Sequence, residues 1–182
     1  MLDEADTSAR ETELAGFFLH AAGNAFVHLR MLGGPEMAEL CAGVEPMSRY
    51  PYPRFAALLA AVGKKVRDMD PILEELGVQM MTDWFHLGPG KGIVSSGLGF
   101  LKYQTGSEGY RSVVNGPAAA IGEFSLVDLD EGAGSARVRS TTPFPRPMER
   151  GVLIGGMRAP GDLAFVEVAN AIDPSLFQIR FR

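Results

Sequence analysis

The stretch "AIGEFSLVDLDEG", residues 120–132, marks the point where the chain changes from helical periodicity to strand periodicity. In an extended chain, successive side chains point to opposite faces of the sheet. Phe124 and Leu126 therefore face one way, and Val127 and Leu129 face the other. The stretch predicts a strand whose two faces are both partly covered. It decides the fold class, because the chain before it has the spacing of helices.

The segments after this strand predict the rest of a sheet. "SARVRSTT", residues 135–142, alternates polar and apolar residues, and it forms a hairpin with the first strand across "DEGAG", residues 130–134. "RPMERGVLIGGMRAPG", residues 146–161, carries apolar residues near helical spacing. "LAFVEVANAID", residues 163–173, and "LFQIRFR", residues 176–182, predict two more strands. The expected order is β-β-α-β-β.

Upstream of residue 120, apolar residues recur at the three- and four-residue spacing of helices. Thr12 or Ser8 is placed to cap the first helix, and Gly33–Gly34 to end it. Helices are expected in segments 11–33, 35–43, 69–88, 93–106 and 107–117, and in a segment that begins at Pro53.

This separation of helices from strands predicts an α+β fold, with an N-terminal helical layer packed on a C-terminal antiparallel sheet. We expect one domain over residues 11–182, preceded by a frayed or disordered segment at residues 1–10.

Composition narrows the function classes. The net charge of −5 disfavours a nucleic-acid partner, which usually needs a basic face. No apolar run approaches the roughly 20 residues that span a bilayer, and the acidic, polar N-terminus is unlike a signal peptide. A single cysteine, Cys41, allows no internal disulfide. We expect a cytoplasmic protein with no nucleic-acid partner and no membrane span.

The glycine-rich stretch "FHLGPGKGIVSSGLGF", residues 85–100, matches neither strong phosphate-binding pattern. A phosphate loop needs G-x-x-x-x-G-K-[ST], but Gly92 follows Lys91, and Phe85 stands where the first glycine should be. The G-x-G-x-x-G fingerprint also fails at every register. The stretch is interpreted as a connection between helices that gates a cavity beside it, or alternatively as a surface turn.

Several segments resemble an uncharacterised domain family expanded in myxobacteria: "GFFLHAAGNAF", "YPYPRFAALLAAVGKKV", "ILEELGVQMMTDWF", "GYRSVVNGP", "GVLIGGM" and "FVEVANAI…FQIRF". That family is similar to a wider fold shared by haem-nitric-oxide sensor domains, vinyl-reductase-type ligand sensors and small subunits of the TRAPP tethering complex. The resemblance covers about residues 13–182 and implies an α+β fold. The relatives bind haem, small aromatics, an acyl chain or other proteins, so the fold alone names no function.

Two departures from this resemblance bear on cofactors. Haem sensors carry an axial histidine on the helix before the sheet, whereas "GSEGYRSVVNGP", residues 106–117, has none, and Tyr110 lies nearest that place. Vinyl-reductase-type sensors often bind zinc through cysteines near the C-terminus, where this chain has none. We therefore expect neither haem nor a metal.

The candidate ligand-binding residues divide into an apolar set and a polar set. Tyr110 and Arg111 would fix the polar end of a ligand, since Arg holds a carboxylate by two hydrogen bonds; in the alternative, Tyr110 anchors the helix and Arg111 faces solvent. His86 would act at the pocket mouth, or alternatively interact with carbonyls at its own helix end. The apolar candidates, which alternatively are plain core, are Met80, Trp84, Phe100 and Tyr103.

The chain shows no G-x-S-x-G elbow and no H-E-x-x-H motif, so no catalytic residue is assigned. We expect a non-enzymatic sensor or binding module with an apolar pocket between helices and sheet, whose ligand is an apolar or aromatic small molecule. The alternative is a protein-interaction scaffold with a filled core, in the manner of TRAPP subunits. A homodimer is expected in either case.

Overall fold

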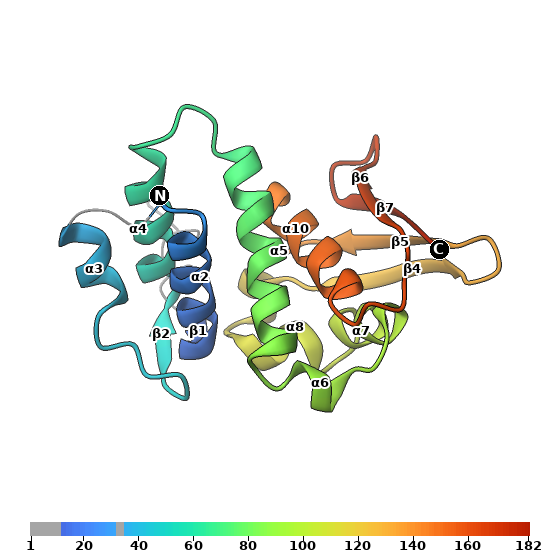
Figure 1. Cartoon of the computed structure of the whole chain (residues 1–182), viewed down its shortest axis with the longest axis horizontal. Coiled ribbons are helices and arrows are strands. Elements are labelled where there is room, and N and C mark those ends of the chain that lie inside the picture. The colour runs from blue at the N-terminus through green and yellow to red at the C-terminus, as the bar shows by residue number, and fades with distance from the viewer. Residues whose placement is uncertain (1–11, 32–34) are drawn as a thin grey trace.

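The computed structural model describes residues 12–31 and 35–182. It confirms the α+β fold class: helices dominate the first part of the chain, and an antiparallel sheet closes it (Figure 1). Two expectations, the frayed segment at residues 1–10 and the helix end at Gly33–Gly34, lie outside the described residues.

The N-terminal part contains a small three-stranded sheet that the sequence did not predict. The strand order is β2-β1-β3, with β1 (Glu13–Ala15) antiparallel to both neighbours, β2 (Arg49–Pro51) and β3 (Val114–Asn115). The helices around it are α2 (Gly16–His28), α3 (Pro35–Cys41), α4 (Tyr52–Gly63) and the long α5 (Asp70–His86).

The first helix starts later than predicted. Residues 13–15 pair with β2, so α2 begins at Gly16 and no side chain caps it. The first free N–H groups of α2 instead donate to loop carbonyls: Gly16 N–H to Ser48 O at 2.8 Å, and Phe17 N–H to Pro46 O at 2.9 Å. This loop replaces the cap that Thr12 was expected to supply, because orphan donors at a helix start need some acceptor.

The glycine-rich stretch forms the end of α5, a turn, and two short helices. These are α6 (Gly90–Ile93) and α7 (Gly97–Gln104). Ser96 caps α7 by accepting a hydrogen bond at Oγ from the Gly99 N–H at 2.9 Å. The chain continues through α8 (Gly109–Val113), β3 and α9 (Ala118–Ile121). The two predicted short helices correspond to α7 and α8, but the second ends where β3 begins, and α9 was not predicted.

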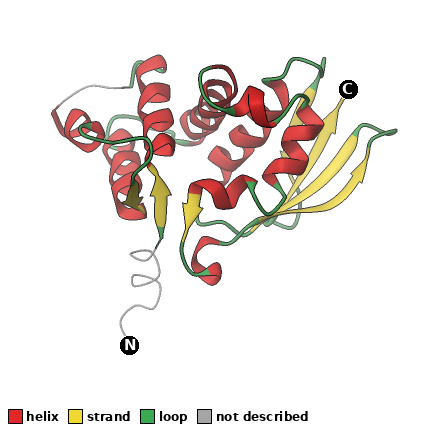
Figure 2. Cartoon of the chain, turned by 90° about the horizontal axis from the view of Figure 1, so that it is seen from below, coloured by secondary structure: helices red, strands yellow, loops and turns green. Residues whose placement is uncertain are grey.

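The C-terminal sheet has the order β4-β5-β7-β6, with every pair antiparallel. Its strands are β4 (Phe124–Asp130), β5 (Ser135–Ser140), β6 (Val166–Asn170) and β7 (Leu176–Phe181), and α10 (Arg146–Arg158) lies between β5 and β6 in the chain. The predicted β-β-α-β-β order is therefore confirmed. Figure 2 shows the helices gathered on one face of this sheet. Buried and exposed residues alternate along β5 and β7, as expected for a sheet covered on one side.

One detail of the first strand was predicted wrongly. The register with β5 shifts between Leu126 and Asp128, so that Val127 forms a β-bulge. The extra residue resets the alternation, and Leu129 lies opposite Ala136 on the same face as Leu126. Val127 stays exposed. The strand therefore buries one face, where unbroken alternation predicted two partly covered faces.

Helices α5 and α10 cross with their backbones in direct contact, in the middle of the molecule (Figure 1). Glycines on both helices face the partner backbone: Gly77 faces Met148 and Gly151, Gly151 faces Glu74, and Gly155 faces Val78. A Cβ on Gly155 would lie only 2.6 Å from the carbonyl oxygen of Val78. An ion pair between Arg150 and Glu74 closes the crossing at its edge.

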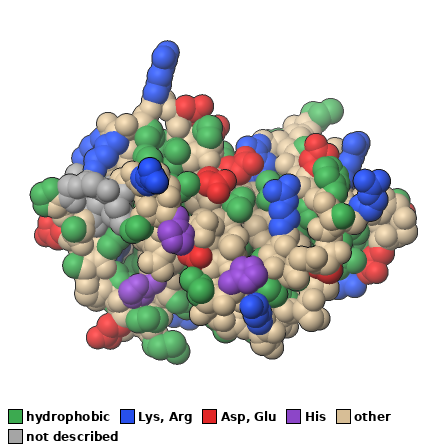
Figure 3. Space-filling view, in the orientation of Figure 1, with side chains coloured by type: hydrophobic (Ala, Val, Ile, Leu, Met, Phe, Trp, Pro, Cys, Tyr) green, Lys and Arg blue, Asp and Glu red, His purple; other side chains and the backbone are tan. Residues whose placement is uncertain are grey.

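The surface mixes charges of both signs. Figure 3 shows Lys and Arg side chains interspersed with Asp and Glu side chains on one face. Over residues 12–31 and 35–182, no helix has both the length and the apolar character to cross a bilayer.

The α5–α10 crossing predicts the effect of adding one methyl group. Gly151→Ala would place its Cβ into the carbonyl of Glu74 and force two helix backbones apart. We expect a loss of about 3 kcal/mol in the free energy of unfolding, measured by urea denaturation. Gly92→Ala is the control, because nothing lies within 4 Å of a Cβ at that position. Equal stability of the two variants would contradict this account of the crossing.

Candidate functional site

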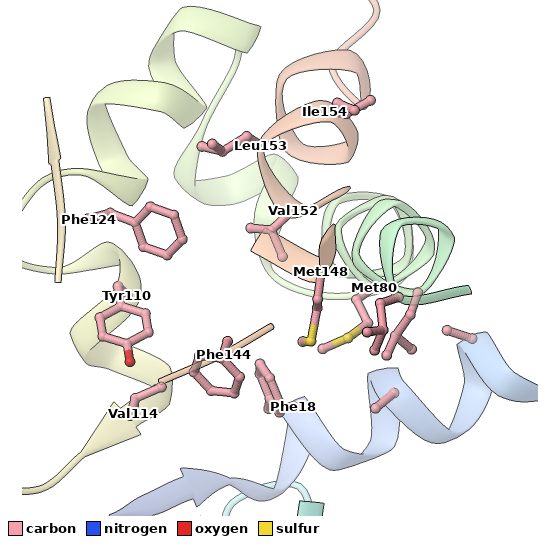
Figure 4. Packing of buried hydrophobic residues seen from close by; sticks show 14 of the residues in the cluster. Phe18, Met80, Tyr110, Val114, Phe124, Phe144, Met148, Val152, Leu153 and Ile154 are labelled. Carbon is pink, nitrogen blue, oxygen red and sulfur yellow. The ribbon is translucent and has the colours of Figure 1, made fainter. Parts of the chain in front are cut away.

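An apolar cavity of about 60 Å³ lies between the helices and the sheet. Side chains from α2, α5, α7, α8, β4 and α10 line it, together with Phe144 from the segment before α10. Most of them are aromatic rings or methionines. Figure 4 shows Phe18, Tyr110, Phe124 and Phe144 arranged around a common space with Met148.

Five of the predicted ligand-binding residues meet at this cavity. Met80 and Trp84 reach it from α5, Phe100 and Tyr103 from α7, and Tyr110 from α8. These three helices follow one another within residues 70–113, and α10, which contacts both α5 and α7, holds them around the cavity. Their binding role remains a prediction, but their shared position is a feature of the fold.

The Trp84 indole forms part of an aromatic cluster in the cavity wall. It stacks on Tyr103 with ring centroids 5.8 Å apart and planes 17° apart, and it meets Phe100 edge-on at 6.0 Å. Both arrangements suit the ring quadrupole. The indole is half-buried and its N–H has no hydrogen-bond partner in the described part of the chain.

The Tyr110 ring lies between the cavity and the sheet. Its hydroxyl donates a 2.6 Å hydrogen bond to the carbonyl of Ile121, and its ring meets Phe124 and Phe144 edge-on. Burial, with a smaller contribution from the carboxylate of Glu149, raises the pKa of Tyr110 well above its usual value. The phenol therefore stays protonated at neutral pH and ties α8 to the end of α9.

Arg111 and His86 do not line this cavity. Arg111 is exposed, and its Nη2 atom lies 3.9 Å from Oε2 of Glu123. It borders a separate surface hollow of about 390 Å³, which shares Tyr110 and Phe124 with the cavity. His86 is exposed at the end of α5, where its ring meets Phe85 edge-on.

Glu149 is a wall residue that the sequence analysis missed. Its side chain is 2 % exposed, and one carboxylate oxygen accepts hydrogen bonds from the hydroxyls of Ser140 and Thr142. The other oxygen forms a 3.1 Å ion pair with Arg146, which in turn lies over the ring of Phe177. The signal was present, because Glu149 interrupts the apolar face that begins at Met148.

Gln104 is a second wall residue that the sequence analysis missed. It is 8 % exposed, it ends α7, and its side-chain amide makes no hydrogen bond to any described residue. Its spacing from Phe100 and Leu101 places it on the buried face of α7. The sequence signal was a polar residue at a helical position where the neighbouring buried positions are apolar.

Within the described ranges, no three His, Cys, Asp or Glu side chains form a group able to hold a metal ion.

Comparison with solved structures identifies the fold. An H-NOX protein from S. oneidensis in the Fe(II)NO ligation state aligns with a TM-score of 0.69 at 9% identity, covering 93% of this chain and 99% of that one. An oxygen-binding H-NOX domain related to soluble guanylate cyclases aligns at 0.66 and 11% identity, covering 93% and 95%. A variant H-NOX protein from K. algicida, in the Fe(II) unliganded state, aligns at 0.60 and 13% identity, covering 93% and 97%.

The chain has the H-NOX fold. At these identities the likeness is one of fold alone. No family model matches the chain, and no curated protein matches it in sequence. The resemblance to a myxobacterial domain family stays a prediction.

The residues of this H-NOX fold do not fit haem. His20, His28 and His86 all lie outside the cavity wall, and Cys41 does too. The hydroxyl of Tyr110 is hydrogen-bonded to Ile121 and held protonated, which opposes iron ligation by tyrosinate. The volume of about 60 Å³ is also well below the roughly 300–1,000 Å³ of pockets that hold cofactors.

We predict that the purified protein carries no stoichiometric haem, because the cavity lacks both the space and an axial ligand. Absorption spectra of the protein as isolated, and after incubation with excess hemin, check this. A Soret band at one haem per chain would contradict the prediction. Loss of such a band in Tyr110→Phe would then identify the ligand.

Burial raises the pKa of the Glu149 carboxyl above its usual value, although Ser140, Thr142 and Arg146 partly oppose this. A raised pKa in the folded state means that the folded protein holds the proton more tightly than the unfolded chain. The resulting stabilisation is fully present below about pH 4.3, the ordinary Glu value. It is lost as pH rises through the folded-state pKa.

We therefore predict that, as pH rises from about 4, the free energy of unfolding of wild type falls relative to that of Glu149→Gln. Urea denaturation of both proteins at a series of pH values measures it. A difference that instead grows in favour of wild type with rising pH would show that Arg146 dominates and that the carboxylate form is the favoured one.

Proposed function

We propose that this H-NOX-fold domain binds a small, mainly apolar molecule in the cavity between its helices and its sheet, and that it acts as a sensor or binding module without catalysis. The observation that carries the proposal is the cavity wall. It gathers aromatic rings and methionines from separate elements around space that side chains leave unfilled. Concave apolar sites with a few polar groups are the usual form of a small-molecule site.

The size of the cavity limits the ligand. An apolar protein cavity of about 150 Å³ is known to take up benzene or xenon. The space here is about 60 Å³, so a ring-sized ligand needs side chains to move. Met80, Met81 and Met148 lie in the wall and are the residues best able to do so, because methionine has three rotatable bonds and adapts to irregular shapes.

The names of the structural neighbours support a ligand-binding role on this fold. One is described as oxygen-binding and another was solved in an Fe(II)NO ligation state. Those names say nothing about the ligand of this chain, whose cavity does not fit haem. The proposal therefore takes from the neighbours only the use of this fold for small-molecule binding.

Other expectations remain proposals that rest on the sequence. These are a single domain, a homodimer, a cytoplasmic location, membership of the myxobacterial family, and the absence of a nucleic-acid partner. The scaffold alternative, with a filled core and a protein partner, is an outcome of the following test.

Trp84 is the only tryptophan in the chain and lines the cavity, so its emission reports on the site. We expect at least one member of a panel of small aromatics and fatty acids to shift or quench this emission. The same compound should raise the melting temperature, since a ligand at 100 times its dissociation constant stabilises by about 2.7 kcal/mol. Fluorescence titration and thermal unfolding measure the two effects.

Two variants locate the binding. Ala21→Met extends a side chain from α2 into the cavity and should abolish the response, whereas Asn24→Met places the same side chain on the exposed face of that helix and should not. If no compound moves the Trp84 signal, and Trp84→Ala costs the roughly 3–5 kcal/mol of a solid core, the scaffold alternative replaces the proposal.

A further inference from the structure

Some polar side chains of the cavity wall have hydrogen-bond partners within the protein, and others have none. The Ser112 hydroxyl donates to the carbonyl of Gly109 at 2.8 Å, and the Tyr110 hydroxyl to Ile121. Both carboxylate oxygens of Glu149 accept hydrogen bonds. In contrast, the amide of Gln104 and the indole N–H of Trp84 have no partner among the described residues.

Of these two side chains, Gln104 has more hydrogen-bonding groups without a partner. It offers two N–H donors and a carbonyl acceptor. Its nitrogen and oxygen are not among the fully buried side-chain atoms that lack a partner, so water or a ligand can reach them. The cavity, at about 60 Å³, has room for water that could bond to this amide.

Stability does not explain a glutamine here. The Gln104 amide makes no hydrogen bond to the described protein, so replacing it by an apolar side chain of similar shape removes no protein hydrogen bond. The position of Gln104 is nevertheless firmly set, because α8 packs closely on the end of α7. A Cβ on Gly109 would lie 2.6 Å from the Cα of Gln104. The fold thus fixes the backbone of Gln104 beside the cavity that its side chain lines.

The charges around the cavity exclude ionic ligands. Glu149 is the charged residue in the wall, and it is already neutralised by Arg146. An anion would be buried next to this carboxylate with no cation in the wall to pair with. A cation would have to compete with Arg146 for it. Arg111, expected to hold a carboxylate, does not reach this cavity.

We infer that Gln104 determines ligand specificity. It binds, through its side-chain amide, a ligand with an apolar body and one neutral hydrogen-bonding group: a phenol, an alcohol or a primary amide. This inference rests on the proposed function. It goes further by naming the ligand class and the residue that recognises it.

The test compares toluene with phenol, which have similar size and shape but differ in the hydroxyl group. Dissociation constants are measured from Trp84 emission at neutral pH, for wild type and for Gln104→Leu. The variant should weaken phenol binding about tenfold and leave toluene binding unchanged, because it removes one or two neutral hydrogen bonds. Benzoate, the anionic analogue, should bind neither protein.

Thr105→Val is the matched control. It removes a polar group from the next residue, whose hydroxyl bonds to the carbonyl of Leu101 and does not line the cavity. Both dissociation constants should match those of wild type. Gln104→Met serves as a second variant if the leucine variant does not fold. The melting temperature of either Gln104 variant should equal or exceed that of wild type.

The outcomes separate this inference from the proposed function. If toluene and phenol both bind and the Gln104 variants change neither affinity, the role of Gln104 is wrong and the ligand site stands. Benzoate binding as tight as phenol overturns the neutral class. If Ala21→Met also fails to abolish any binding, or none of the three compounds binds wild type, the site and the inference fall together. Melting temperatures many degrees lower in both Gln104 variants would show that the amide supports the fold, and would also overturn the inference.

Discussion

The contact between the backbones of α5 and α10 is the constraint that organises this molecule. Glycines at the crossing, Gly77, Gly151 and Gly155, let the two helices approach until each meets carbonyl oxygens of the other. Helix α5 also packs against α2, and α10 packs against β6. The crossing therefore joins the N-terminal helical layer to the C-terminal sheet. A methyl group at these glycines would act on both halves at once, because close-packed interiors transmit strain.

The cavity is a consequence of this arrangement. Met80 on α5 and Met148 on α10 flank the crossing, and the aromatic rings of α7, α8 and β4 surround the space beside it. The polar side chains of the wall differ in their hydrogen bonding. Glu149 is enclosed by two hydroxyls and a guanidinium, whereas Gln104 is left without a partner. The hydrogen-bonding capacity of Glu149 is thus used within the protein, whereas the amide of Gln104 is left for a ligand.

The fold and the chemistry of the site point to different conclusions about haem. The backbone follows H-NOX proteins over 93% of the chain, yet the side chains of the cavity offer no histidine and little volume. A backbone course depends on the apolar pattern and on where chains can approach, and many sequences meet those conditions. Binding a cofactor depends on a few particular side chains, so it is lost or replaced while the fold persists.

Periodicity in the residue order was enough to predict the long helices, the four strands of the main sheet and the α+β class, because each of these buries a repeating apolar face. Residue type, and not periodicity, brought Met80, Trp84, Phe100 and Tyr103 into the candidate set as aromatic or methionine side chains, and Tyr110 as a hydrogen-bonding partner of Arg111. The three short strands were missed, since a strand such as Glu13–Ala15 exists only through partners at Arg49–Pro51 and Val114–Asn115. The bulge at Val127 was missed for a related reason: register is a property of two strands together. Whether Arg111 reaches the cavity, and whether Gln104 finds a hydrogen-bond partner, depend on groups distant in the chain. Those distances are fixed only when the helices and the sheet have packed.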